Sequence, residues 1–105
     1  MTEATVAAEL EAARAASHPG RARVCARRAA GAAIRLWRPD WAGDALKLLR
    51  RLQTEETVAL EAREAARRLC ARVTVDHSWP FDTDPIEDAE RVISALAQNR
   101  MTEAP

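Results

Sequence analysis

The chain has 105 residues, with 16 Lys and Arg against 16 Asp and Glu, three glycines and no tyrosine. This length supports one hydrophobic core, and the abundance of Ala, Arg, Glu and Leu favours helices strongly over sheet. No apolar run approaches the roughly 18–20 residues of a membrane span, and the acidic start MTEATVAAELEAA lacks the pattern of a signal peptide. We therefore expect a cytoplasmic protein without membrane contact.

The balanced net charge conceals an uneven distribution of charge along the chain. Residues 14–51 carry ten Lys or Arg against two acids, whereas residues 54–105 carry six Arg against eleven acids. Charge pairing within the chain, pairing between subunits and binding of an anionic ligand each account for such an asymmetry.

The first two predicted helices cover about residues 3–16 and 20–38. Thr2 is the expected N-cap of the first helix, and the stretch SHPG at 17–20, in which His18 is a turn residue, separates the two. On a helical wheel, small residues with Leu36 fill one side of the second helix, which would let a neighbouring helix approach closely.

The other side of residues 21–38 carries six arginines and is a candidate nucleic-acid-binding surface. Arginines at helical spacing can follow a phosphate backbone, and the predicted RNA- or DNA-binding residues are Arg23, Arg27, Arg28 and Arg35. No aromatic residue lies between them, so stacking on single-stranded bases is not expected. A solvated or salt-bridged helix face is the alternative interpretation.

Val24 and Ile34 are the two apolar residues on this arginine side. They indicate a second contact surface, which another copy of the chain would occupy. Together with the uneven charge distribution, they are the basis for predicting a homodimer.

Two more helices are predicted between residue 40 and about residue 74. Pro39 ends the preceding helix and Asp40 is the expected N-cap of the next. Thr54, followed by two glutamates, predicts the start of the fourth helix. The expected inward-facing residues of the two helices are Trp41, Ala45, Leu48, Leu49 and Leu52, then Val58, Ala62, Ala65, Leu69 and Val73. Glu64 and Arg68 are expected to form an ion pair at i, i+4.

The two cysteines, Cys25 and Cys70, fall within predicted helices and lack metal-ligand spacing. Buried, reduced thiols are expected, as is usual for cysteines with no further signal. A disulfide between the two helices is the alternative.

The last predicted helix begins at the capping box Asp84-Pro85-Ile86-Glu87 and closes at Asn99. This makes residues 1–98 a single helical domain and residues 99–105 a frayed tail. Because the connections between the middle helices are short, neighbouring helices should be antiparallel. The predicted fold is all-α, a compact antiparallel up-and-down bundle of four to five helices.

The segment ARRLCARVTVDHSWPFDTDP at 66–85 contains the candidate catalytic residues, Arg72 and His77. A guanidinium can hold a phosphodiester bidentately, and an imidazole can take the proton from an attacking ribose 2′-hydroxyl. The two side chains can approach each other only if the helix ends near Thr74. The alternative is structural, with Arg72 as a solvated or Glu-paired arginine and His77 as a loop residue beside Trp79.

The same segment supports neither a metal nor a cofactor site. Asp76, His77, Asp82 and Asp84 would need a second histidine nearby, and Asp84 already serves as a helix cap. We expect Trp79, Pro80 and Phe81 to cover one end of the bundle as an apolar plug. No Gly-rich phosphate loop and no Ser/His/Asp or Cys/His nucleophile arrangement is present.

A compact bundle that carries an Arg-x4-His element resembles the HEPN domains, which are all-α proteins of about this size. The stretch DTDPIEDAERVISAL at 82–96 looks like the closing helix of that family. ARRAAGAAIRLW at 26–37 is similar to its Ala-rich early helix. The resemblance covers about residues 4–98. It implies a homodimer and, in catalytic members, a metal-independent ribonuclease that often acts as a toxin beside a nucleotidyltransferase-type antitoxin.

Carried over to this chain, the resemblance makes Arg72 the phosphate ligand and His77 the acid and base. Val73 departs from the active pattern, which favours a polar residue directly after the arginine, and other family members have lost activity. The sequence therefore favours a homodimeric, non-catalytic interaction or accessory module. The alternatives are a toxin-like endoribonuclease that uses Arg72 and His77, and an RNA- or DNA-binding protein that acts through residues 21–38.

Overall fold

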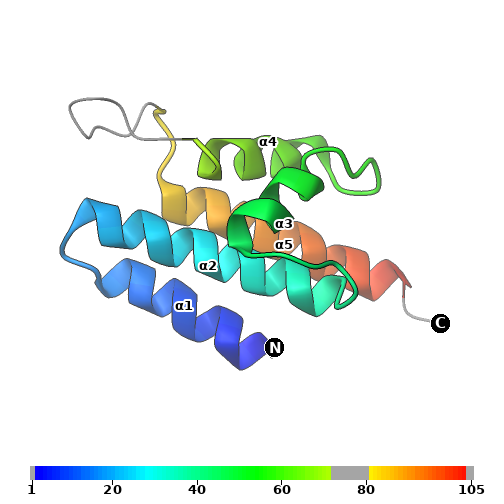
Figure 1. Ribbon diagram of the computed structural model, residues 1–105, viewed down its shortest axis with the longest axis horizontal. Helices are drawn as coiled ribbons and strands as arrows, with labels where there is room; N and C mark the ends of the chain where they lie inside the picture. Colours follow the sequence, from blue (N-terminus) through cyan, green and yellow to red (C-terminus); the bar gives the residue numbers. More distant parts are fainter. Residues whose placement is uncertain (1, 72–80, 104–105) are drawn as a thin grey trace.

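The computed structural model describes residues 2–71 and 81–103, which form five α-helices and no strand. The helices are α1 (Glu3–Ala15), α2 (Pro19–Trp37), α3 (Ala45–Leu52), α4 (Leu60–Leu69) and α5 (Pro85–Glu103). Helices α1 and α2 form an antiparallel hairpin, and α4 runs opposite to α5 (Figure 1). The predicted all-α antiparallel bundle is confirmed. Among the described residues, no helix combines the length and the apolar composition that crossing a membrane requires.

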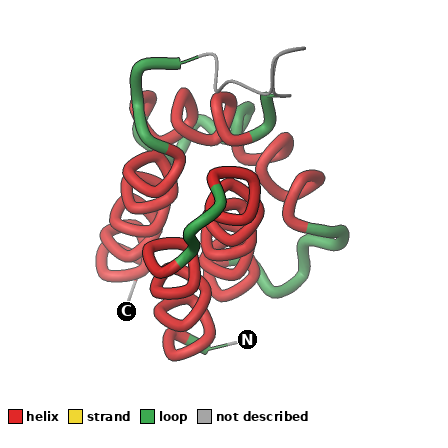
Figure 2. Tube along the Cα trace, turned by 90° about the vertical axis from the view of Figure 1, so that its left-hand side faces the viewer, coloured by secondary structure: helices red, strands yellow, loops and turns green. Residues whose placement is uncertain are grey.

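Helix α2 is the centre of the bundle, because all four other helices pack against it (Figures 1 and 2). Its small residues allow the close approach that the sequence predicts, with Ala26, Ala29 and Ala30 fully buried. The largest fully buried apolar side chains of the described core are Ile34, Leu48, Leu49, Leu52, Leu69, Leu96, Val58 and Val92.

The burial of Ile34 corrects one prediction. Its side chain is fully buried within its own chain, so it does not mark a contact with another copy. The helical wheel placed it among arginines because a wheel assumes one solvent-facing side, whereas α2 is packed on several sides. Val24, the other apolar residue of that side, is 44% exposed.

Side-chain caps define the starts of the first two helices. The Thr2 hydroxyl accepts a hydrogen bond from the Thr5 N–H, as its predicted N-cap role requires. At the start of α2, His18 Nδ1 accepts a hydrogen bond from the Gly20 N–H at 3.0 Å. His18 is therefore an N-cap, a more specific role than the turn residue that the sequence suggested.

The N-cap of α3 is Asp44, so the prediction of Asp40 is wrong. The Asp44 carboxylate accepts a hydrogen bond from the Lys47 N–H at 3.0 Å. The chain needs the residues between 40 and 44 to turn the Trp41 indole inward, where it meets Trp37 edge-on with ring centroids 5.6 Å apart. Burial of this indole delays the start of the helix by one turn.

Helix α4 also begins later than predicted, at Leu60 and not at Thr54. The preceding residues form successive turns, in which the Val58 N–H donates to the Glu55 carbonyl and Val58 becomes buried. The expected pairing of Glu64 with Arg68 is corrected as well. Arg68 pairs with Asp88, since α5 brings that buried carboxylate within 2.8 Å of the guanidinium.

The start of α5 is confirmed, because the Asp84 carboxylate accepts a hydrogen bond from the Ile86 N–H at 2.7 Å. The helix does not close at Asn99 but continues to Glu103. Two contacts hold this last turn: the Asn99 side chain donates to the Thr57 carbonyl, and Arg38 forms an ion pair with Glu103. Both contacts come from other parts of the chain, so no local signal predicts them.

Candidate functional site

The close approach of α3 to α2 divides the arginine side of α2. A Cβ atom added at Gly31 would lie 2.7 Å from the Ala45 Cβ, so the start of α3 lies directly on the α2 backbone. Arg23 and Arg27 fall on one side of this contact, and Arg28 and Arg35 on the other. The four arginines predicted to bind nucleic acid therefore do not form one continuous surface.

Arg28 and Arg35 face a concavity that also contains acids. It is lined by residues of α1, α2 and the start of α3, with Glu9 and Asp44 among them. Arg35 Nη2 donates to the Gly43 carbonyl at 2.6 Å, which supports the turn before α3. Because carboxylates lie beside these two arginines, this surface has no marked preference for an anion.

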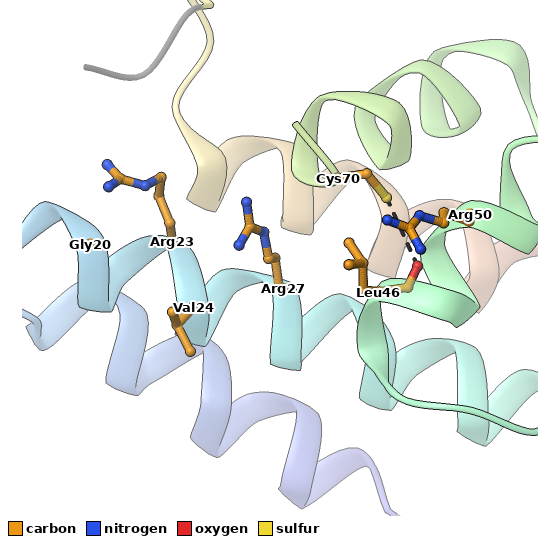
Figure 3. Close-up of a pocket in the computed structure, with 7 residues that line it drawn as sticks. All are labelled: Gly20, Arg23, Val24, Arg27, Leu46, Arg50 and Cys70. Atoms are coloured by element: carbon orange, nitrogen blue, oxygen red, sulfur yellow. Dashed lines mark hydrogen bonds between the residues drawn. The ribbon is translucent and has the colours of Figure 1, made fainter. Parts of the chain in front are cut away.

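Arg23 and Arg27 line a different concavity, which we call the basic pocket (Figure 3). It has a volume of about 490 Å³ and is lined by Gly20, Arg23, Val24, Arg27, Leu46, Arg50 and Cys70. Its walls come from α2, α3 and the residue that ends α4 (Figure 3). No carboxylate lines it, so its side chains contribute three positive charges and no negative charge.

Arg27 is held in place by the end of α4. Its Nε donates to the Leu69 carbonyl and its Nη2 to the Ala71 carbonyl, the latter at 2.7 Å. These are carbonyls of the last turn of a helix, which lack partners within the helix itself. Burial lowers the pKa of the Arg27 guanidinium, Cys70 opposes this, and Arg23 adds to it. An arginine in such surroundings still remains protonated near neutral pH.

Arg23 and Arg50 have no such partners. Within the described residues, neither side chain makes a hydrogen bond or an ion pair. Five arginines in other parts of the described chain are paired with carboxylates: Arg14 with Glu90, Arg38 with Glu103, Arg68 and Arg91 with Asp88, and Arg100 with Glu3. The other described arginines outside the pocket form no ion pair, but they do not line a common concavity that lacks a carboxylate. The basic pocket thus contains positive charge that no carboxylate of residues 2–71 or 81–103 pairs with.

Cys70 forms part of the pocket wall. The Gln53 amide donates to its sulfur at 3.5 Å, and the thiol lies 4.0 Å from the Leu46 carbonyl (Figure 3). Burial raises the pKa of the Cys70 thiol, while Arg50 and Arg27 partly oppose that effect. The thiol is therefore neutral at pH 7 and a poor nucleophile. Both cysteines are free thiols, as predicted, but only Cys25 is buried as expected, whereas Cys70 is half-buried.

The pocket is suited to holding an anion. Guanidinium groups near one another repel, and an oxyanion bound between them removes this repulsion while it accepts charge-assisted hydrogen bonds. Sequence reasoning identified two of the three arginines and missed Arg50. The available signal was that Arg50 follows Leu46 by one turn on the side of α3 opposite its buried leucines.

The predicted catalytic residues Arg72 and His77 lie outside the described residues, as do Asp76, Trp79 and Pro80. The prediction about them stays a prediction. In the described ranges 2–71 and 81–103, no group of three or more His, Cys, Asp or Glu could hold a metal ion.

Comparison with known proteins supplies no relative whose role could be transferred to this chain. No protein-family model, no curated protein and no solved structure matches it. The chemistry of the basic pocket is therefore the basis for a functional assignment.

Proposed function

We propose that this chain is a non-catalytic helical interaction module that binds phosphate groups of RNA through the basic pocket. The observation that supports this proposal is that Arg23, Arg27 and Arg50 line one pocket without a carboxylate. A phosphate oxyanion matches the fork of N–H donors on each guanidinium, and its charge is retained across the physiological pH range. Binding would therefore rest on electrostatics and would depend on salt.

The test is the affinity of single-stranded RNA for the wild-type protein and for a double variant, Arg23→Gln with Arg50→Gln. Neither side chain has a partner in the described chain, so the variant should fold normally. We expect its dissociation constant to rise by about tenfold or more and the salt dependence of binding to become less steep. Fluorescence anisotropy of a labelled oligonucleotide, at several salt concentrations, measures both.

The matched control is Arg28→Gln with Arg67→Gln, which removes the same charge from exposed residues outside the basic pocket. This control should bind RNA nearly as well as the wild type. Equal losses in the two double variants would mean that net charge, and not the pocket, determines binding. A wild-type protein that fails to bind RNA at low salt would contradict the proposal altogether.

The proposal includes a HEPN-like architecture and a homodimer. Support comes from the all-α bundle and from Val24, an exposed apolar side chain in the basic pocket. Sedimentation at tens of micromolar should report a dimer for the wild type. A protein that stays monomeric over this range removes the dimer from the proposal.

A metal-independent ribonuclease that uses Arg72 and His77 is the second candidate function. The observation in its favour is that Arg27 holds the carbonyl of Ala71, the residue before Arg72, at the edge of the basic pocket. This candidate requires that RNA be cleaved in the presence of a chelator and that His77→Ala abolish cleavage. RNA that remains intact with concentrated wild-type protein rules it out.

A further inference from the structure

Three guanidinium groups from two helices line the basic pocket. Arg23 and Arg27 are one turn apart on the same side of α2, and Arg50 enters from α3. Arg27 and Arg50 both influence the Cys70 thiol, and Arg23 influences Arg27. Arg27 thus lies between Arg23 and Arg50 along the pocket (Figure 3).

The positive charge of these three arginines is greater than the charge needed to neutralise one internal phosphodiester. A phosphodiester in a nucleic-acid strand carries one negative charge and two non-bridging oxygens. A terminal phosphomonoester carries about −1.5 to −2 charges at pH 7 and three acceptor oxygens. Three guanidinium groups without a carboxylate partner in the described residues match the terminal phosphomonoester better, both in charge and in number of hydrogen-bond donors.

The walls of the pocket are also suited to the end of a nucleic-acid strand. The Arg27 side chain bridges α2 to the end of α4 through the Leu69 and Ala71 carbonyls and so closes one side. Its Nη1 group makes no hydrogen bond within the described residues and remains available to a ligand. The apolar side chain of Leu46 lies in the pocket wall beside the arginines, where a sugar or base attached to the phosphate can rest.

We propose that the basic pocket recognises a terminal phosphomonoester, that of a phosphorylated RNA end or of a free nucleotide, in preference to an internal phosphodiester. In this arrangement Arg27 is positioned in advance by the α4 carbonyls. Arg23 and Arg50 close on the phosphate from two helices. The inference rests on the proposed function, since it names the group that the same pocket binds.

The experiment compares RNA oligonucleotides of one sequence that differ only at their ends. One pair carries a 5′-phosphate or a 5′-hydroxyl with the fluorophore at the 3′ end, and a second pair reverses these positions. We expect a phosphorylated end to bind about tenfold or more tightly than a hydroxyl end, because the hydroxyl lacks the dianion. Arg23→Gln with Arg50→Gln should abolish this difference, and Arg28→Gln with Arg67→Gln should retain it.

A nucleoside 5′-monophosphate, the matching nucleoside and inorganic phosphate serve as competitors. Displacement of labelled RNA by the monophosphate at concentrations similar to those of the phosphorylated oligonucleotide identifies a free nucleotide as the ligand. Displacement only by the oligonucleotide identifies an RNA end. Either result supports recognition of a terminal phosphomonoester.

Three results would overturn the inference in distinguishable ways. Equal binding of phosphorylated and hydroxyl ends, lost in the pocket variant, would overturn end recognition and leave RNA binding in the pocket intact. Absence of binding to every oligonucleotide would overturn both proposals. A phosphate preference that survives Arg23→Gln with Arg50→Gln would overturn the assignment to this pocket.

Discussion

Arg68 of α4 donates hydrogen bonds to both carboxylate oxygens of Asp88 on α5, and Asp88 is fully buried. The Thr83 hydroxyl and the Arg91 guanidinium donate to the same carboxylate, each at 3.0 Å. The hydrogen bond to Asp88 raises the pKa of Arg68. A buried carboxylate with this many donors joins α4 to α5 and fixes how the two helices pack.

Replacing Asp88 with Asn should therefore destabilise the bundle strongly. The change preserves the shape of the side chain but leaves the Arg68 guanidinium, with only 17% of its side chain exposed, without a counter-charge. We expect the free energy of unfolding to fall by about 3 kcal/mol, as when one partner of a buried ion pair is removed. Urea unfolding measures it. The exposed Glu87→Gln serves as the control, and an unchanged Asp88→Asn midpoint would show that the pair contributes no stability.

Gly31→Ala should destabilise the protein because α3 lies against the α2 backbone. The added methyl group would lie 2.7 Å from the Ala45 Cβ and 2.9 Å from its Cα. Relieving this overlap should cost about 1–3 kcal/mol of unfolding free energy, even though Ala is the better helix former. At Gly20, a methyl group would lie 3.1 Å from the His18 ring and 3.6 Å from Arg23 Nη2, both side-chain contacts, so Gly20→Ala should lower the melting temperature less than Gly31→Ala does. Similar melting temperatures for the two variants would contradict the close approach.

Arg27→Lys separates the structural role of Arg27 from its charge. Lysine retains the positive charge but cannot donate from one rigid fork to the Leu69 and Ala71 carbonyls. We expect the free energy of unfolding to fall by about 1 kcal/mol, while the salt dependence of RNA binding stays close to that of the wild type. Arg28→Lys, at an exposed residue without such contacts, should change neither quantity. An unchanged stability of Arg27→Lys would mean that the carbonyl contacts are not maintained in solution.

The pH dependence of Cys70 alkylation reports on the electrostatics of the pocket. In a Cys25→Ala background, iodoacetamide should react with Cys70 with an inflection above pH 9.0, because burial raises the pKa of this thiol above that ordinary value. Arg50→Gln should move the inflection higher still, since Arg50 stabilises the thiolate. An inflection below 9.0, or one that Arg50→Gln lowers, would contradict the geometry of the pocket.

The raised pKa of the Cys70 thiol also makes the free energy of unfolding depend on pH. A thiol whose pKa is raised in the folded state contributes stability that is fully present below its unfolded pKa and is lost as the pH rises through the folded pKa. The free energy of unfolding should therefore decrease at pH values above about 9. Cys70→Ala should remove the part of this decrease that Cys70 causes, which urea unfolding at several pH values can measure.

The all-helical bundle could be predicted from the sequence because its determinants are local. Apolar residues at a period of 3.6 define the inner sides of the helices, and caps such as Thr2 and Asp84 bond to N–H groups two or three residues away. The predicted starts of α3 and α4 are wrong because contacts between residues distant in the sequence determine them. Asp40 and Thr54 are acceptable caps by local criteria, and the burial of Trp41 and Val58 from a distance selected other residues.

The basic pocket, too, has one part that follows from local sequence and another that depends on the tertiary structure. That Arg23 and Arg27 share one side of a helix follows from their spacing of four residues, which the sequence alone determined. Only the tertiary structure decided that α3 separates Arg28 and Arg35 from them and adds Arg50. The physical reason is that the packing of the helices determines whether a carboxylate lies beside an arginine. The periodicity of a single helix carries no information about that choice.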